Sequence, residues 1–209
     1  EAVEKFTLDK PALICRWRMS NKKVPMLNRH IRALSERLVQ GEPLTHNMLS
    51  WAKQHVEWSL AEGDYTARDG VLMLVIDING NAAMTVGEYE PLADTSAKAL
   101  RARSAEARSE ADETGVAPEL LAAVNNGELA FVPPADEFLC GTATLIEQLA
   151  QTKGISVTRV DIPAQLKGAL FLVSDEHGVV PAADADAAES DAATVAFFAD
   201  GYEKLRARR

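Results

Sequence analysis

The chain has 209 residues, 47% of them hydrophobic, and a formal net charge of −9 at pH 7. This is enough apolar sequence for one large domain or two small ones with real cores. The negative charge disfavours nucleic acid and anionic membranes as partners, because either would be held against the protein's own field. No apolar run reaches the roughly 18 to 20 residues that span a bilayer. The first ten residues lack the basic start and apolar core of a signal peptide. We therefore expect a soluble, cytoplasmic protein.

The cysteines and histidines do not suggest a metal site. Cys15 and Cys140 are far apart and lack metal-ligand spacing, so we expect free, buried thiols in a reducing compartment, with a disulfide as the less favoured alternative. His46 and His55 are nine residues apart and do not share a helical face at ligand spacing. We expect no bound metal.

The first half of the chain predicts a hairpin, two helices and a second hairpin. Residues 12–19 read as a strand with Arg16 and Arg18 on one face, and a turn at 20–23 leads to a second strand at 24–27. Asn28 is expected to cap a helix that ends at Gly41, and Thr45 to cap a longer one. The apolar run 71–78, the turn 79–81 and residues 82–88 predict a hairpin, because Asn-Gly readily adopts positive φ.

The second half begins after an expected linker at 91–96. A helix capped by Thr95 or Ser96 should run to about residue 114, with its charges mostly on a solvated face. Residues 117–124 are ambiguous between helix and strand. We then expect a turn at 125–127, a helix after Gly141, strands at 155–160 and 169–173, an acidic connector, and a last helix at about 192–208.

Residues 131–182 give the sharpest functional lead. Two turns of small residues, 141–142 and 174–178, each follow an apolar segment, which is where an α/β protein tends to bind an anion. Residues 141–144 combine backbone N–H groups at a helix N-terminus with threonine hydroxyls, as a phosphate requires. An ordinary N-cap before an amphipathic helix explains the same residues equally well.

Three stretches together resemble the class IV aminotransferase family, the fold-type IV pyridoxal-phosphate (PLP) enzymes that include D-amino-acid and branched-chain aminotransferases and aminodeoxychorismate lyase. RWRMSNKKVPMLNRHIRALSERL is similar to the family's opening strand and H-x-x-R helix, with His30 at the histidine and Ala33 where the arginine stands. FVPPADEFLCGTATLIEQLAQTKGISV is similar to its phosphate turn and following helix. LFLVSDEHGVVPA is similar to the strand and turn that bind phosphate a second time.

This resemblance implies an α/β (α+β), two-layer and two-domain fold like that of D-amino-acid aminotransferase. Residues 1–92 and 98–209 would form the domains and 93–97 the linker. It also implies a homodimer that binds PLP and an amino-acid-like substrate. The implied site residues are the catalytic Lys98, the cofactor-binding Gly141, Thr142, Ala143 and Arg68, and the substrate-binding Arg16, Arg18 and His177. A solvated helix lysine at 98 and exposed turn residues at 68 and 177 are the simpler alternatives.

The sequence also departs from the family's pattern. The motif that carries the glutamate for the cofactor's pyridine nitrogen is missing around residues 117–132, and Thr144 stands where an arginine follows the phosphate turn. Asp175 and Glu176 occupy the second turn, so either they point away or the site no longer holds the phosphate. We therefore carry two main hypotheses, a divergent PLP-dependent aminotransferase or lyase and a non-catalytic relative used for binding or dimerisation. A third, an unrelated α/β protein, predicts no cleft joining Lys98 to Gly141.

Overall fold

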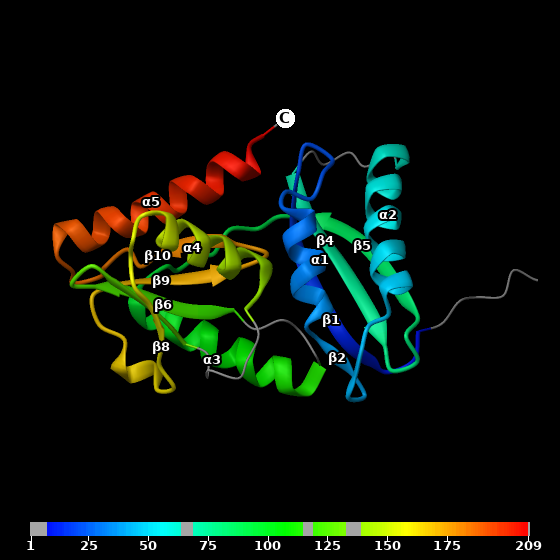
Figure 1. The fold of residues 1–209 in the computed structure, drawn as a ribbon, viewed down its shortest axis with the longest axis horizontal. Coiled ribbons are helices and arrows are strands. Elements are labelled where there is room, and N and C mark those ends of the chain that lie inside the picture. Colours follow the sequence, from blue (N-terminus) through cyan, green and yellow to red (C-terminus); the bar gives the residue numbers. More distant parts are fainter. Residues whose placement is uncertain (1–7, 64–68, 115–118, 133–138, 209) are drawn as a thin grey trace, which may run out of the picture.

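The computed structural model describes residues 8–63, 69–114, 119–132 and 139–208. In these residues the helices and strands form two main sheets, with helices packed against them, and one small two-stranded sheet, as the predicted α/β class requires (Figure 1). One sheet comes from the first half of the chain and the other from the second half. None of the described helices combines the length and apolar character needed to cross a membrane.

The first sheet is antiparallel, with strand order β1-β4-β5. It contains β1 (Pro11–Ser20), β4 (Asp69–Asp77) and β5 (Ala82–Glu88). Alternate residues of β1 point into a core that the helices α1 (Leu27–Ser35) and α2 (His46–Glu62) cover from one side. The predicted Thr45 cap of α2 is present, since its hydroxyl oxygen accepts a hydrogen bond of 3.1 Å from the Met48 backbone N–H.

The predicted opening hairpin is wrong. β1 pairs along its length with β4, and the turn after it is closed only by an isolated bridge between Ser20 and Lys23. Met26 has a φ of 59° and is itself the N-cap of α1, so residues 24–27 cannot run on as a strand. Helix α1 ends at Ser35 rather than at Gly41. The Gly41 φ of 81° instead serves a small hairpin of β2 (Leu38–Val39) and β3 (Glu42–Pro43).

The predicted hairpin β4–β5 is confirmed, with Gly80 at a φ of 82° in its turn. A buried carboxylate supports this turn from inside. Asp77 accepts hydrogen bonds from the backbone N–H groups of Asn79 and Asn81, both at 2.9 Å. These bonds lower the pKa of Asp77, although burial alone would raise it.

The second sheet has the order β10-β9-β6-β7-β8. All of its neighbours are antiparallel except β7 and β8, which are parallel. The ambiguous segment after residue 117 contributes a strand, which is buried on both faces because helices cover both sides of the sheet. The strands are β6 (Leu120–Asn125), β7 (Glu128–Val132), β8 (Val157–Arg159), β9 (Ala169–Ser174) and β10 (Gly178–Pro181).

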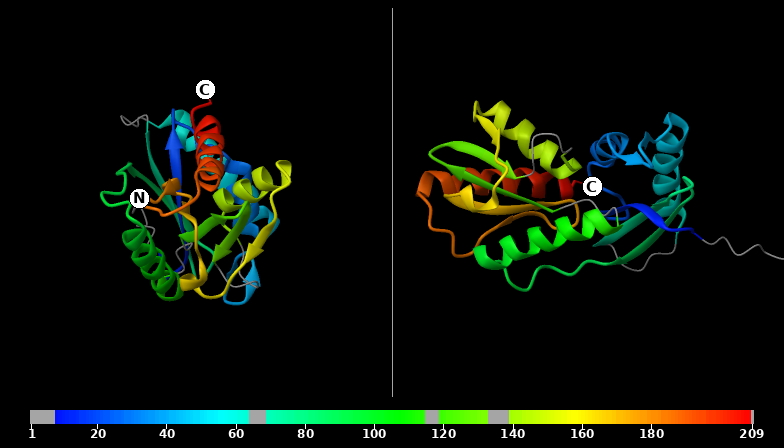
Figure 2. Two further views of the ribbon diagram at one scale, coloured as in Figure 1. Left: turned by 90° about the vertical axis from the view of Figure 1, so that its left-hand side faces the viewer. Right: turned by 90° about the horizontal axis from the view of Figure 1, so that it is seen from below.

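Three helices sandwich this second sheet (Figure 2). Helix α3 (Ala97–Thr114) packs Leu100 against Leu121 and Ala123 of β6, on one face. Helices α4 (Gly141–Thr152) and α5 (Glu189–Arg206) pack against Ala122 and Val124, on the other face. A short 3-10 helix, η1 (Pro163–Gln165), joins β8 to β9. The two faces of one strand thus separate α3 from α4 and α5.

Helix α5 begins at Glu189, so part of the predicted acidic connector is helical. Asp191 in its first turn is only 3% exposed and accepts hydrogen bonds from the backbone N–H groups of Asn126 and Gly127, both at 2.9 Å. It therefore fixes the β6–β7 turn. Val195, Phe198 and Tyr202 of α5 are buried, and Leu205 is half-buried.

Candidate functional site

The two halves of the chain meet at the N-terminus of α4. Helix α1 of the first half packs against α4, and the Arg18 backbone N–H in β1 donates a 3.0 Å hydrogen bond to the Asp175 backbone carbonyl. Asp175 lies between β9 and β10, in the turn that resembles the family's second phosphate turn. The junction thus brings together the three stretches that carry the resemblance.

Asp175 fills the anion-binding position at the start of α4. One oxygen of its carboxylate, Oδ1, accepts hydrogen bonds from the Thr142 backbone N–H at 2.9 Å and from the Thr142 hydroxyl at 2.8 Å. The Thr142 residue is fully buried and the Asp175 side chain is only 10% exposed. These are the donors that a helix N-terminus offers to a phosphate, and an internal carboxylate already uses them.

His30 closes the same position from the side of α1. Its ring stacks on Trp17 of β1, with centroids 5.3 Å apart. Its Nδ1 lies 3.6 Å from Asp175 Oδ1 and has no hydrogen-bond partner among the residues that the structure describes. Burial lowers the pKa of His30, although Asp175 opposes that shift. A Cβ at Gly141 would stand 2.5 Å from His30 Nδ1, so only glycine allows this contact. Ala143, the third predicted cofactor-binding residue of this turn, packs its side chain into the core.

A second group of polar side chains surrounds His177. The Arg18 guanidinium lies 3.4 Å from the centroid of the Tyr89 ring, and the Tyr89 hydroxyl is 3.1 Å from His177 Nδ1. Arg103 Nη2 is 3.1 Å from His177 Nε2. Because a guanidinium can only donate, Nε2 must accept, and the ring proton lies on Nδ1 facing Tyr89.

Burial favours the neutral form of His177. Burial lowers its pKa to about 4; Glu119 opposes that shift, and Arg103 and Arg18 add to it. Arg103 also pairs with Glu119 at 2.8 Å, so this arginine of α3 belongs to the junction and not to a solvated face. The structure thus brings Arg18 and His177 together. Both ring nitrogens of His177 have partners, whereas Arg18 Nε is buried without a hydrogen-bond partner among the described residues.

The remaining predicted site residues are Arg16, Lys98 and Arg68. Arg16 lies at the edge of the junction: it forms an ion pair with Glu110 of α3 at 3.5 Å, and its charge opposes the rise in the pKa of Glu176 that burial causes. Lys98 is an exposed residue in the first turn of α3. Since α3 and α4 cover opposite faces of the second sheet, Lys98 and Gly141 are not neighbours (Figures 1 and 2). Arg68 falls outside the described residues.

Sequence reasoning missed the partners that turn these residues into a network. Tyr89, Arg103 and Glu119 come from three different segments, and only the folded chain places them around His177. The missed role of Asp175 had a signal in the sequence, because two acids, Asp175 and Glu176, follow a strand in one turn while a Gly-Thr helix start stands in the other. Within the described residues, no cluster of histidine, cysteine and acidic residues could hold a metal ion, and both cysteines are free thiols.

No family model matches the sequence, and no curated protein is significantly similar to it. Solved structures are similar in fold. A hypothetical aminotransferase from Mycobacterium tuberculosis, in its apo form, matches with a TM-score of 0.65 and 13% identity over 100% of this chain and 96% of its own. The PLP-bound form of a hypothetical aminotransferase from the same organism matches with a TM-score of 0.60 and 11% identity over 98% of this chain and 96% of its own. A putative 4-amino-4-deoxychorismate lyase from Legionella pneumophila matches with a TM-score of 0.59 and 12% identity over 94% of this chain and 96% of its own.

These likenesses establish the fold. The chain has the fold of the fold-type IV aminotransferases and aminodeoxychorismate lyases, as the three sequence stretches implied. The hypothesis of an unrelated α/β fold is therefore not supported. Activity has to be argued from the site, because one fold can carry many functions.

Proposed function

We propose that this chain keeps the fold-type IV aminotransferase fold without PLP chemistry, and that it is a binding protein whose site lies where its two sheets meet. One observation carries this proposal. The Asp175 carboxylate accepts both hydrogen bonds that Thr142 can donate at the N-terminus of α4. A cofactor phosphate would need those donors and would meet a negative charge in their place.

The electrostatic cost supports the proposal. A phosphate charge about 4 Å from the Asp175 carboxylate is repelled by about 4 kcal/mol at an effective dielectric constant of about 20. This corresponds to almost a thousandfold weaker binding. His30 supplies no compensating cation near neutral pH, because burial keeps its pKa below the ordinary value. The residues at the start of α4 therefore do not fit the phosphate of PLP.

The position of Lys98 agrees with this conclusion. Schiff-base catalysis needs a lysine amine beside the cofactor, in a site that shields it from water. Lys98 is exposed at the start of α3, across the second sheet from α4. Its role as the catalytic lysine remains the competing hypothesis, and the same experiment tests both.

The experiment is an absorbance spectrum of the purified protein with millimolar PLP, followed by borohydride reduction and intact-mass measurement. We expect no Schiff-base band beyond that of free lysines, and equal reduced adduct in the wild type, Lys98→Ala and the matched control Lys167→Ala, another exposed lysine. A band that reduction fixes, and that disappears in Lys98→Ala but not in Lys167→Ala, would establish the PLP enzyme instead.

The finer expectations from the resemblance belong to the same proposal. We expect a small, amino-acid-like ligand, a domain division at residues 93–97 and a homodimer in the cytoplasm. Light scattering coupled to size-exclusion chromatography should give twice the mass of one chain, and a monomer at micromolar concentration would remove the homodimer from the proposal.

A further inference from the structure

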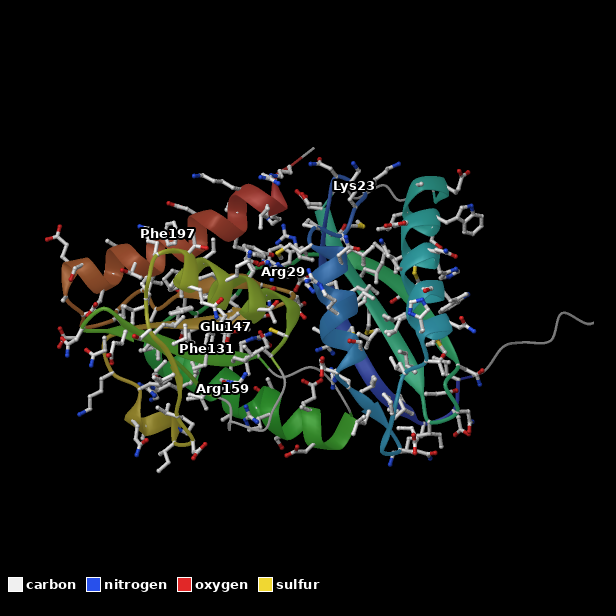
Figure 3. All side chains as sticks on the ribbon, in the orientation of Figure 1. Lys23, Arg29, Phe131, Glu147, Arg159 and Phe197 are labelled. Carbon is white, nitrogen blue, oxygen red and sulfur yellow. The ribbon has the colours of Figure 1, made fainter. Side chains whose placement is uncertain are left out.

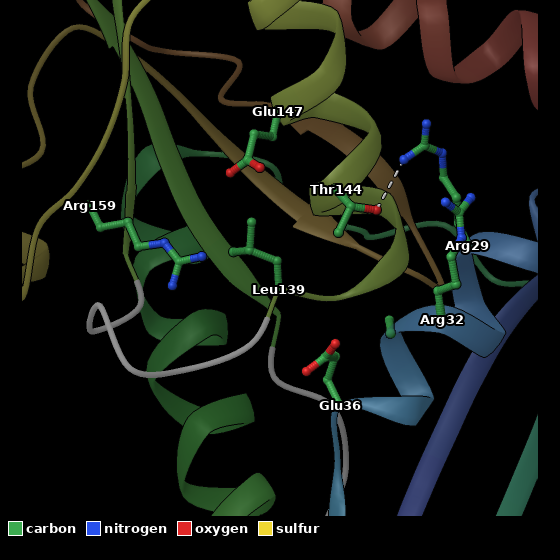
Figure 4. Close-up of a pocket in the computed structure, with 8 residues that line it drawn as sticks. Arg29, Arg32, Glu36, Leu139, Thr144, Glu147 and Arg159 are labelled. Carbon is green, nitrogen blue, oxygen red and sulfur yellow. Dashed lines mark hydrogen bonds between the residues drawn. The ribbon is translucent and has the colours of Figure 1, made fainter. Parts of the chain in front are cut away.

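An open pocket of about 360 Å³ lies beside the Asp175 site, between α1, α4 and β8 (Figure 4). This volume falls in the range of small-molecule sites. Leu139 provides an apolar surface in it, and Figure 3 places Arg29 at the junction of the two halves, with Glu147 and Arg159 on the second half. The charged residues that line the pocket are Arg29, Arg32, Glu36, Glu147 and Arg159.

The two arginines of α1 form a cationic pair that has no ion-pair partner among the described residues. Arg29 and Arg32 are one helical turn apart, and Arg29 is half-buried. The pKa of Arg29 is lowered first by burial and then by the charge of Arg32, so the two guanidiniums repel each other. Within the described part of the chain, Arg29 donates to two neutral groups, the Thr144 hydroxyl at 3.3 Å and the Gln148 side-chain amide oxygen, and Arg32 donates to the Asn28 carbonyl.

No carboxylate of the described residues lies within ion-pair distance of Arg29 or Arg32. The protein as a whole carries a net charge of −9, so an unneutralised pair of cations is unusual for its surface. An anion between the guanidiniums would remove their repulsion and gain charge-assisted hydrogen bonds. A carboxylate, with two coplanar oxygens, and a phosphate, with tetrahedral oxygens, can each accept paired hydrogen bonds from guanidinium groups.

The side of the pocket opposite α1 carries charges of both signs. The Glu147 carboxylate, on α4, points into the space shown in Figure 4, and Arg159 of β8 lies on the same side, whereas Glu36 directly follows α1 on the side of the arginine pair. A simple inorganic anion would bind the arginines without making a favourable contact with these carboxylates. A ligand with hydroxyl or ammonium groups would donate to them while its anionic end stays on the arginines.

We propose that this pocket binds a small organic anion, with a phosphate or carboxylate held by Arg29 and Arg32 and an ammonium or hydroxyl group facing Glu147. The inference rests on the proposed function in one respect, that the chain is a binding protein. Its site is separate from the position that Asp175 fills, because Thr142 serves that position and Thr144 lines the pocket.

Titration by two-dimensional NMR and calorimetry at constant ionic strength tests this proposal. The probes are O-phosphoserine, inorganic phosphate and malonate, so the phosphate and carboxylate sources of the anion are compared directly. We expect saturable binding of O-phosphoserine with shifts at the Thr144 amide and the arginine Nε–H groups. Tighter binding of phosphate than malonate, or the reverse, identifies which anionic group the arginines prefer.

Arg32→Gln should weaken O-phosphoserine binding at least tenfold, and Arg29→Gln should do the same if it folds normally. The matched control Arg208→Gln makes the same charge change at an exposed position near the end of the chain and should have less than a twofold effect. Glu147→Gln should weaken O-phosphoserine several-fold without weakening inorganic phosphate. Arg32 is exposed and makes one side-chain hydrogen bond, so its variant should keep the fold.

Absence of saturation at 20 mM O-phosphoserine, or equal weakening by Arg32→Gln and Arg208→Gln, would overturn the inference. These outcomes are independent of the PLP experiment. A Schiff base on Lys98 would refute the proposed loss of PLP chemistry but would not affect the result of the anion titration. A failed anion titration would refute the anion pocket but would not affect the PLP result.

Discussion

Asp175 is the residue whose replacement should have the clearest effect on the junction. Asp175→Ala removes the acceptor for two buried donors, the Thr142 backbone N–H and hydroxyl. Asp175→Asn keeps an oxygen in the same place and removes only the negative charge. The two variants therefore separate the hydrogen bonds from the charge.

The structure sets the expected magnitudes. Each buried donor left without a partner costs about 1 to 3 kcal/mol, so the two donors freed by Asp175→Ala should lower the free energy of unfolding by about 2 to 6 kcal/mol. Asp175→Asn loses the interaction of a carboxylate with the helix dipole and should cost about 1 kcal/mol. For a chain of this length, about 1 kcal/mol corresponds to a Tm change of roughly 2 to 4 °C.

Urea unfolding followed by circular dichroism measures both variants, with Thr142→Val completing a double-mutant cycle. The coupling between positions 142 and 175 should be about 1 kcal/mol or more, because the hydroxyl bond is shared by both side chains. An Asp175→Ala variant within about 0.5 kcal/mol of the wild type would refute this reasoning. So would an Asn variant as unstable as the Ala variant.

Three further predictions concern separate features. Burial lowers the pKa of His177 to about 4. The unfolded chain therefore binds more protons than the folded one between about pH 4 and pH 6.5. The stability that depends on a neutral His177 is complete above about pH 6.5 and is lost as the pH falls toward about 4. An NMR titration should give a His177 midpoint near 4, and a midpoint near 6.5 would contradict the described environment. Gly141→Ala should cost about 1 to 3 kcal/mol, because its Cβ would stand 2.5 Å from His30 Nδ1, whereas Gly87→Ala, with open space around it, should be nearly neutral. Asp191→Ala should cost about 2 kcal/mol in urea unfolding by leaving two turn N–H groups without their acceptor, and an unchanged unfolding midpoint would show that the turn does not need it.

The sequence predicted correctly those elements whose conformation depends on neighbouring residues alone. The Asn79-Gly80 turn and the Thr45 cap have the expected geometry, because both depend on backbone conformations that neighbouring residues specify. The error at residues 24–27 has a tertiary cause. Val24 is buried and therefore resembles a strand residue, but its burial comes from packing at the end of the first sheet. Met26 adopts a positive φ that the sequence pattern does not predict.

The candidate site could likewise be predicted from the sequence only in part. Ala33, Thr144 and the acids of the second turn indicated from sequence that the phosphate position is altered. The direction of the Asp175 carboxylate was beyond sequence reasoning, because Thr142 is 33 residues away and meets it only when β9 and α4 pack together. The pocket between α1 and β8 was also hidden, since Arg32 and Arg159 are brought together by the contact between the two halves.

The most direct test of the account follows the Thr142 amide resonance in a ¹H–¹⁵N spectrum while PLP is added to millimolar concentration. We expect this resonance to stay in place, because the Thr142 N–H already donates to Asp175, whereas the Thr144 amide, which donates to the Cys140 carbonyl, should shift when an anion enters the neighbouring pocket. A saturable shift of the Thr142 resonance with the cofactor, absent with pyridoxal lacking the phosphate, would show that the phosphate displaces Asp175 and would contradict the account.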